Sequence, residues 1–220
     1  MKTSAKREQN TKPRLQNAKS VNGFVADKYE AILRAAIRVF SQNGYFNSKV
    51  ADIAREAGIA DGTVYLYFKS KEEILHSIFD RAMEEFISEG KKEIAGIAEA
   101  DKRLQRIAQL HLERLGADRD LAIVFQVELR GSIKFMQEFS AAGFAEYLEI
   151  IHQTIVEGQN AGIFRKNLNP TICSKMLFGA LDEMVTNWIL SPKAYPLAPM
   201  ANPVLEVFFG GMRDAKNPKS

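Results

Sequence analysis

The sequence has little of what would indicate a secreted, membrane-bound or disulfide-linked protein. Its 220 residues contain a single cysteine, Cys173, which excludes an intrachain disulfide and any cysteine-based metal site. No apolar run approaches the roughly 20 residues of a membrane-spanning helix. The charged N-terminus is not followed by the apolar stretch of a signal peptide. These absences predict a cytoplasmic protein without a membrane partner.

Catalytic and metal-binding motifs are also lacking. The three histidines, His76, His111 and His152, stand singly and without the spacing of metal ligands. There is no glycine loop that would cradle a phosphate and no nucleophile with a positioned base. We therefore expect no enzyme activity, no metal and no cofactor.

Helical periodicity runs through the chain, and strand-like alternation of apolar and polar residues is absent. With 46% hydrophobic residues, the chain can bury a sizeable core. The sequence therefore predicts an all-α fold of about nine helices. They are expected over about 27–43, 48–57, 61–67, 71–93, 104–115, 121–129, 133–160 (whole, or broken near Gly143), 170–190 and 203–213.

Helix starts are marked by residues whose side chains accept hydrogen bonds from free backbone N–H groups. Asp27 and Ser70 each precede a glutamate by three residues, which is the spacing of a capping box. Asn169 and Asn202 each precede a proline, which favours the first helical position. We expect helices to begin at these four places.

Positive charge is concentrated at the N-terminus. Residues 1–20 hold six basic residues and one acid and therefore carry a charge of +5. The whole chain has a net charge of +3, so the remaining residues sum to −2. The segment is polar and has no aromatic residue, which predicts a disordered basic tail over residues 1–24. Such a tail either follows DNA phosphates or serves as a solubilising terminus, and the sequence leaves both possibilities open.

Residues 48–71 carry the pattern of two short helices that meet at a sharp turn. Ala54 is small enough for the helices to approach, and Gly58 can take the left-handed conformation that ends the first helix. Val64 is a branched apolar residue that would seal the second helix from above. Such a unit is a helix-turn-helix, whose second helix can enter the DNA major groove.

The segments AAIRVFSQNGY, IAREAGIADGTVYLYF and KSKEEIL resemble the N-terminal region of the TetR family of bacterial repressors, over roughly residues 28–76. The resemblance implies a homodimer that binds a palindromic double-stranded DNA operator and is released by a ligand. It implies a helix-turn-helix three-helix DNA-binding domain over residues 25–71. A C-terminal helical ligand-binding and dimerisation domain would cover residues 72–215.

Carried over by position, the recognition helix runs from Ala60 to Phe68. Hydroxyl and ammonium groups are suited to phosphate contacts, whereas no arginine or glutamine at the helix tip announces a base contact. One of Tyr65 and Tyr67 is expected to pack its ring between helices. The expected DNA-binding residues are Ser48, Lys49, Asp61, Gly62, Thr63, Tyr65, Tyr67 and Lys71.

Two segments of the second half, LAIVFQVELRGS and FGALDEMVTNW, look like the branch of this family that represses fatty-acid degradation and binds long-chain acyl-CoA. The resemblance implies control of such genes and acyl-CoA as effector. A neutral or cationic drug-like effector is the alternative, and acids lining the pocket, Glu128 or Asp182, would favour it.

The candidate ligand-binding residues are phenylalanines of the second half and polar or basic residues on apolar helices. For each apolar residue and His111, packing in the core is the competing interpretation; for the basic residues it is a solvated helix face. Asp182 either faces a ligand or hydrogen-bonds to its neighbours. The candidates are Arg103, Ile107, His111, Phe125, Leu129, Phe139, Phe144, Tyr147, Phe178 and Asp182.

The last two predicted helices have broad apolar faces that we expect to form the dimer interface. A two-fold protein would match a two-fold operator. The competing class is an architectural DNA-binding protein without a ligand; the large aromatic-rich second half and the small net charge argue against it. The expected interface residues include Met176, Leu177, Met184, Trp188 and Phe208.

Overall fold

The computed structural model describes residues 15–128, 130, 137 and 143–213, with side chains from residue 27 onward. Within these ranges the chain forms nine α-helices, one π-helical and one 3₁₀ segment, and an isolated bridge between Phe164 and Arg213 as its only strand-like pairing. The all-α prediction is confirmed. No helix in these ranges is long and apolar enough to cross a membrane.

Two groups of elements follow one another along the chain. The first comprises α1 (Leu15–Asn43), α2 (Val50–Ala57), α3 (Asp61–Val64) and α4 (Lys71–Ile94). The second comprises α5 (Ala100–Ala117), α6 (Arg119–Ile123), the π-helix η1 (Val124–Glu128), α8 (Gly143–Asn160), α9 (Pro170–Leu190), the 3₁₀ segment η2 (Ala198–Met200) and α10 (Ala201–Met212).

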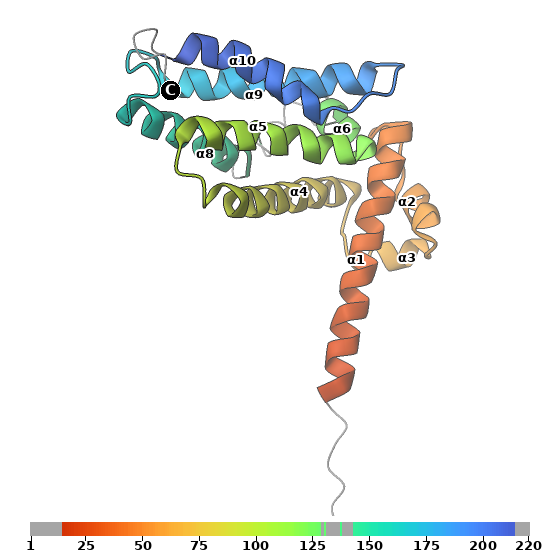
Figure 1. The fold of residues 1–220 in the computed structure, drawn as a ribbon. Coiled ribbons are helices and arrows are strands. Elements are labelled where there is room, and N and C mark those ends of the chain that lie inside the picture. Colours follow the sequence, from red (N-terminus) through yellow and green to blue (C-terminus); the bar gives the residue numbers. More distant parts are fainter. Residues whose placement is uncertain (1–14, 129, 131–136, 138–142, 214–220) are drawn as a thin grey trace, which may run out of the picture.

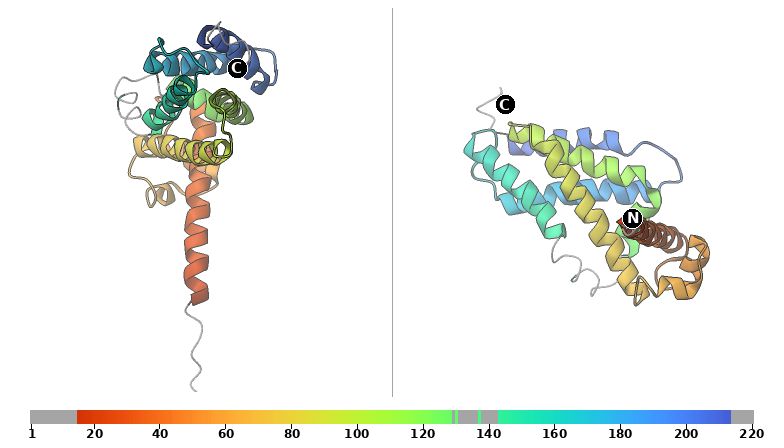
Figure 2. Two further views of the ribbon diagram at one scale, coloured as in Figure 1. Left: turned by 60° about the vertical axis from the view of Figure 1, so that its left-hand side comes forward. Right: turned by 90° about the horizontal axis from the view of Figure 1, so that it is seen from below.

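The second group forms a bundle from which α1 projects. Figure 1 shows α5, α8, α9 and α10 packed together, while α1 extends away from them and carries α2 and α3 on its flank. Seen from below, α4 crosses diagonally under the bundle from the side of α1–α3 (Figure 2). Helix α4 therefore contacts both α1 and the bundle.

Apolar side chains form two clusters. The N-terminal cluster gathers residues of α1–α3 and the first half of α4, among them the fully buried Phe40 and Ile74. The C-terminal cluster gathers residues of α5, α8, α9 and α10, among them Leu112 and Leu177. Val124 belongs to the N-terminal cluster and Ala122 to the C-terminal one. The segment α6–η1 therefore joins the two.

Two of the predicted helix starts are confirmed. The Ser70 hydroxyl accepts a hydrogen bond of 3.1 Å from the backbone N–H of Glu73, at the start of α4. The Asn169 side chain accepts from the N–H of Ile172, also at 3.1 Å, and Pro170 is the first residue of α9. In both cases the short side chain satisfies a backbone donor that the helix itself leaves unpaired.

The other two predicted starts are wrong. Helix α1 begins at Leu15, so Asp27 lies inside it, and residues 15–24 of the expected tail are helical. Residues 15–26 contain no proline, and their one glycine, Gly23, disfavours a helix by only about 1 kcal/mol, so the helix continues through them. Helix α10 begins at Ala201, because η2 runs directly into it, and Asn202 makes no cap.

Gly158 of α8 lies where the buried ring of Phe164 packs most closely on the helix. A Cβ at this position would overlap that ring and lie 3.1 Å from the Cβ of Ala100. We expect Gly158→Ala to destabilise the protein by about 1–3 kcal/mol through overpacking. Urea unfolding followed by circular dichroism measures the difference.

Gly90 of α4 provides the matched control. A Cβ there has no heavy atom within 4 Å outside its own helix. Gly90→Ala is therefore expected to leave the stability unchanged or to raise it by up to about 1 kcal/mol. Equal stabilities of the two variants would contradict the close packing at Gly158.

Candidate functional site

The α2–turn–α3 unit has the geometry of a helix-turn-helix. Ala54 and Val64 are completely buried, and Gly58 has a φ of 67° in the left-handed region. The N–H of Ile59 donates to the Ala54 carbonyl at 3.0 Å and that of Gly58 to the Arg55 carbonyl at 3.2 Å. This pair of bonds is a Schellman motif, which ends α2 and turns the chain into α3.

The recognition helix is shorter than the expected range Ala60–Phe68. Regular α-helix covers only Asp61–Val64. The chain continues in tight turns, in which the N–H groups of Leu66 and Tyr67 donate to carbonyls three residues earlier at 3.2 and 3.0 Å. The tighter turns change which side chains face outward after Val64.

The structure exposes some of the expected DNA-binding residues and places others inside. Tyr65 is exposed, whereas the ring of Tyr67 packs against the N-terminal cluster, as expected for one of the two tyrosines. Ser48 is buried, and its hydroxyl donates to the Gly44 carbonyl at 2.7 Å. Of the remaining residues, Lys49, Asp61 and Gly62 are exposed, and Thr63 and Lys71 are half-buried.

The Lys71 amine holds the turn between α1 and α2. It donates to the carbonyls of Tyr45 at 2.5 Å and Ser48 at 2.7 Å, and lies 4.3 Å from the centre of the Tyr45 ring. Its third acceptor, the Phe46 carbonyl, is 3.5 Å away. Partial burial lowers the pKa of Lys71, and the charge of Glu128 opposes that shift.

Two exposed apolar residues on this unit were not expected from the sequence. Leu66 is 82% exposed and Phe46 is 68% exposed. The buried residues of this segment are Val64 and Phe68, which are four positions apart, and Leu66 lies halfway between them in the sequence. Its spacing therefore puts Leu66 on the opposite face of the helix, and this spacing is the signal that could have identified it as exposed.

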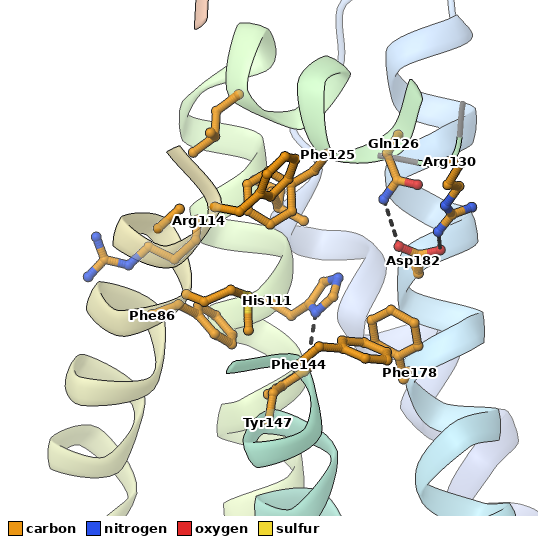
Figure 3. A pocket seen from close by; sticks show the side chains of 15 residues that line it. Phe86, His111, Arg114, Phe125, Gln126, Arg130, Phe144, Tyr147, Phe178 and Asp182 are labelled. Atoms are coloured by element: carbon orange, nitrogen blue, oxygen red, sulfur yellow. Dashed lines mark hydrogen bonds and ion pairs between the residues drawn. The ribbon is translucent and has the colours of Figure 1, made fainter. Parts of the chain in front are cut away.

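A cavity of about 430 Å³ lies between α4, α5, α6, η1, α8 and α9. Aromatic and aliphatic side chains from all six elements form most of its wall (Figure 3). The lining residues are Phe79, Ala82, Met83, Phe86, His111, Arg114, Leu115, Leu121, Phe125, Gln126, Arg130, Phe144, Tyr147, Phe178 and Asp182.

One group of polar side chains on the wall is mutually paired. The Asp182 carboxylate accepts a 2.7 Å hydrogen bond from Gln126 Nε2 and forms an ion pair with Arg130. Gln126 Oε1 in turn accepts from Thr186 Oγ1 at 3.1 Å. The carboxylate thus already has a cationic partner.

His111 and Tyr147 form a second polar group on the wall. His111 Nδ1 lies 3.0 Å from Tyr147 Oη. Burial lowers the pKa of His111 from 6.5 to about 4, with Asp182 opposing the shift. Burial, with Asp182 adding to the effect, raises the pKa of Tyr147 above its ordinary value. Both side chains are therefore neutral at pH 7.

The structure brings together His111, Phe125, Phe144, Tyr147, Phe178 and Asp182 of the expected ligand-binding residues. Ile107 is buried in the C-terminal cluster away from the cavity, and Arg103 is paired with Glu157. Leu129 and Phe139 lie outside the described residues. The sequence interpretation missed the α4 residues Phe79, Met83 and Phe86. Their apolar periodicity does not distinguish a helix that packs in a core from one that lines a cavity.

The segment α6–η1 connects the cavity to α1 and to the α1–α2 turn that precedes the helix-turn-helix. Phe125 lines the cavity, and its ring centre lies 4.4 Å from that of Phe79. Three residues later, Glu128 accepts a hydrogen bond of 2.8 Å from the backbone N–H of Tyr45. Asp120 of α6 accepts from the Ser41 hydroxyl at 2.8 Å. A change at the cavity wall can therefore reach the α1–α2 turn through one short element.

The fold and the two sites define a class of protein: a helix-turn-helix DNA-binding unit attached to a helical bundle with an apolar cavity. Family comparison agrees, since residues 32–78 match the model of bacterial regulatory proteins of the tetR family. Residues 79–211 match the model of the C-terminal region of YsiA-like proteins. The chain belongs to the TetR family, and it is a transcriptional regulator rather than an enzyme.

Individual relatives point to one branch. The chain is 38% identical over 187 residues to the fatty acid metabolism regulator protein of Bacillus subtilis, covering 85% of this chain and 96% of that protein. The FadR regulator of Bacillus halodurans has a TM-score of 0.79 at 35% identity, with 84% of this chain and 95% of that one covered. The structure of FadR of B. subtilis in complex with stearoyl-CoA also has a TM-score of 0.79, at 38% identity, with 83% of this chain and 98% of that one covered.

The buried neutral histidine makes stability depend on pH. In the unfolded chain His111 takes up a proton near pH 6.5, whereas in the folded protein it does so only near pH 4. Between these values the unfolded state binds the extra proton, so stability is full above the window and decreases as the pH falls. The loss reaches up to about 3 kcal/mol at pH 4.

His111→Gln should remove this part of the pH dependence, because its side chain does not titrate. The measurement is the difference in unfolding free energy between the wild type and the variant, obtained in urea from pH 7.5 to pH 4.5. A difference that stays constant over this range would contradict the neutral burial of His111.

Proposed function

We propose that this protein is a dimeric transcriptional repressor of fatty-acid degradation genes, released from a palindromic operator by long-chain acyl-CoA. The observation that carries the proposal is the apolar cavity, which is lined in part by the segment α6–η1. The same segment binds the α1–α2 turn directly before the helix-turn-helix. The name of the B. subtilis relative and the stearoyl-CoA in its FadR structure support the choice of effector. As a DNA-binding regulator, the protein would act in the cytoplasm.

The chemistry of the wall suits an acyl chain. A chain of methylenes offers only apolar surface, and burying each of them contributes roughly 0.8 kcal/mol. Arg130 lines the cavity while remaining partly exposed, and its guanidinium has further N–H donors besides the one that binds Asp182, so these can bind a phosphate of the CoA moiety. We infer that affinity increases with chain length until the cavity is filled.

The alternative effector is a neutral or cationic drug-like compound, and its cationic form would need an unpaired acid. Asp182 is the acidic residue among the lining residues, and Arg130 and Gln126 already bind it. Glu128 is committed to the Tyr45 backbone instead. A cation would have to displace Arg130 from Asp182, which favours the acyl-CoA proposal over this alternative.

Ligand binding would reach DNA through α6–η1 and α4. An acyl chain in the cavity would contact Phe79 and Phe125. Phe79 also belongs to the N-terminal cluster, and Phe125 packs against that cluster. A displacement of Phe125 would carry Glu128 and its Tyr45 contact with it. In a dimer, tilting of the two DNA-binding units changes the spacing of the recognition helices and so the fit to two major grooves.

Blocking the cavity should separate ligand response from DNA binding. Ala82 lines the cavity on α4, and a tryptophan there would fill part of it. We expect Ala82→Trp to bind operator normally but to need at least about tenfold more stearoyl-CoA for release, because several methylenes lose their contacts. The operator is located by footprinting, and release is followed by fluorescence anisotropy of the labelled duplex.

Ala95→Trp is the control, since Ala95 is exposed at the end of α4 and does not line the cavity. Its release curve should match that of the wild type. If stearoyl-CoA releases neither wild type nor control, the effector assignment fails. If Ala82→Trp responds like the wild type, the cavity is not the effector site.

For DNA binding we propose that Lys49 and Lys71 contact phosphates, with Tyr65, Thr63 and the helix tip facing the groove. Ser48 would act through the turn that its buried hydroxyl stabilises. Two N–H groups of the Lys71 amine would continue to donate to the carbonyls of Tyr45 and Ser48. The third would donate to a phosphate in place of the 3.5 Å contact to the Phe46 carbonyl.

Lys49→Ala and Lys71→Ala should each weaken operator binding and reduce the slope of log affinity against log salt by about 1.8, because the dimer loses one phosphate contact in each subunit. Lys71→Ala should also lower the melting temperature, because two carbonyls of the turn lose their donor. Anisotropy titrations at several salt concentrations test this, with the exposed loop variant Lys193→Ala as control. An unchanged slope would remove that lysine from the phosphate contacts.

We propose that the dimer forms through the outward faces of α9 and α10. Met176 is 62% exposed and Val207 is 80% exposed, and Ile172 extends the same face. Met184 and Phe208 are partly buried beside it. Leu177 and Trp188 already pack in the chain's own C-terminal cluster, so they would support the interface from behind.

Replacing both Met176 and Val207 by glutamate should convert the dimer into a monomer, because charged groups would be buried across the two-fold axis. Light scattering after size exclusion at micromolar concentration reports the mass. Leu66→Glu, exposed on the helix-turn-helix, should leave the mass unchanged. A wild-type monomer, or a doubly substituted protein that remains a dimer, would contradict the proposed interface.

A further inference from the structure

The wall of the cavity contains a buried polar atom without a protein partner. His111 is 5% exposed and lines the cavity, and its Nε2 makes no hydrogen bond within the part of the chain that the structure describes. In Figure 3, Nδ1 points at Tyr147 and the other ring nitrogen is turned away from it. An unpaired donor or acceptor in an apolar environment is costly, so a ligand that pairs it gains affinity.

The partner of Nδ1 determines which kind of atom Nε2 can bind. Tyr147 Oη is buried with a 3% exposed side chain, and His111 is the hydrogen-bond partner recorded for it among the described residues. If Tyr147 donates its one hydrogen to Nδ1, the neutral imidazole carries its own hydrogen on Nε2. If Nδ1 instead carried the hydrogen and donated it to Tyr147 Oη, the phenol hydrogen and the lone pair of Nε2 would both be unpaired. This second arrangement is less favourable, because it leaves one more polar group without a partner. Nε2–H is therefore a donor.

Aromatic neighbours hold the imidazole in this orientation. The ring of Tyr147 is stacked at 5.8 Å between centres, and the rings of Phe86 and Phe178 meet the imidazole edge-on at 6.3 and 6.0 Å. Rotation of the ring would break these contacts and the Tyr147 hydrogen bond. The donor is thus fixed before a ligand binds, which lowers the entropy cost of binding.

We propose that His111 Nε2–H binds an acceptor oxygen on the acyl portion of the ligand, either the thioester carbonyl or an oxygen substituent on the chain. The inference rests on the proposed acyl-CoA effector and refines its chemistry. The hydroxyl of Tyr147 is already paired, and Phe86 and Phe178 present only apolar rings to His111, so one oxygen bound at Nε2 would fix the register of the chain in the cavity. Ligands without such an oxygen leave the N–H unpaired and bind less tightly.

Three ligands test the proposal on the unmodified protein. Palmitoyl-CoA and S-hexadecyl-CoA share chain and CoA but differ in the carbonyl oxygen, and β-hydroxypalmitoyl-CoA adds a chain oxygen. If the thioester carbonyl is the acceptor, palmitoyl-CoA should bind about three- to tenfold more tightly than the thioether by calorimetry. If a chain oxygen is the acceptor, only β-hydroxypalmitoyl-CoA should show this advantage over the other two.

Variants assign the preference to His111. His111→Phe removes the donor but keeps a ring, so its affinities for the three ligands should become equal. His111→Gln, which can donate from its amide, should retain part of the preference. Phe144→Leu is the control, since it removes apolar contact without a polar atom and should weaken all three ligands equally. Circular dichroism and operator binding verify that each variant is folded.

The outcomes are distinguishable. Equal wild-type affinities for all three ligands would overturn the role of His111 while leaving acyl-CoA as effector. A preference that persists in His111→Phe would assign the oxygen to another residue and also overturn it. Failure of all three to bind the wild type would overturn the effector assignment itself, and the inference with it.

Discussion

The whole structure depends on the burial of one short segment, Arg119–Glu128, between two apolar clusters. Ala122 is completely buried in the C-terminal cluster, and Val124 is completely buried in the N-terminal one. Cores are close-packed, so neither side chain can shift without displacing its neighbours. The bundle and the DNA-binding unit are therefore joined by packing rather than by a flexible linker. This constraint gives a molecule with two sites a physical means of coupling them.

Some buried polar groups near the cavity already have partners within the protein, and one does not. Asp182 on the cavity wall already has Arg130 and Gln126, and Glu128 already has the Tyr45 backbone. His111 Nε2, by contrast, is buried and unpaired among the described residues. A wall whose acid is already paired, and on which a buried histidine nitrogen lacks a partner among the described residues, is consistent with the proposed ligand, a long apolar chain with an oxygen, rather than with a cation.

The sequence predicted the parts of the structure that depend on local rules. Gly58 and the cap at Asn169 are recognisable because a turn or a helix end needs those residue types within a few positions. The cavity was only partly predictable, since an apolar stripe such as that of Phe79 and Phe86 has the same period in a core. The Glu128–Tyr45 contact was missed, because it joins residues more than eighty positions apart in the sequence. The π-helical segment was also missed, since its residues have the same apolar pattern as a regular α-helix.

We propose that the cavity and the DNA-binding surface are energetically coupled. Two sites that bias one conformational equilibrium must influence each other by the same factor. The most direct measurement determines the operator dissociation constant with and without saturating stearoyl-CoA, and the stearoyl-CoA dissociation constant with and without saturating operator. If the two sites are coupled, operator and stearoyl-CoA should each weaken the binding of the other by an equal factor of about 5 to 150. Operator affinity that does not change at saturating stearoyl-CoA would contradict the coupling.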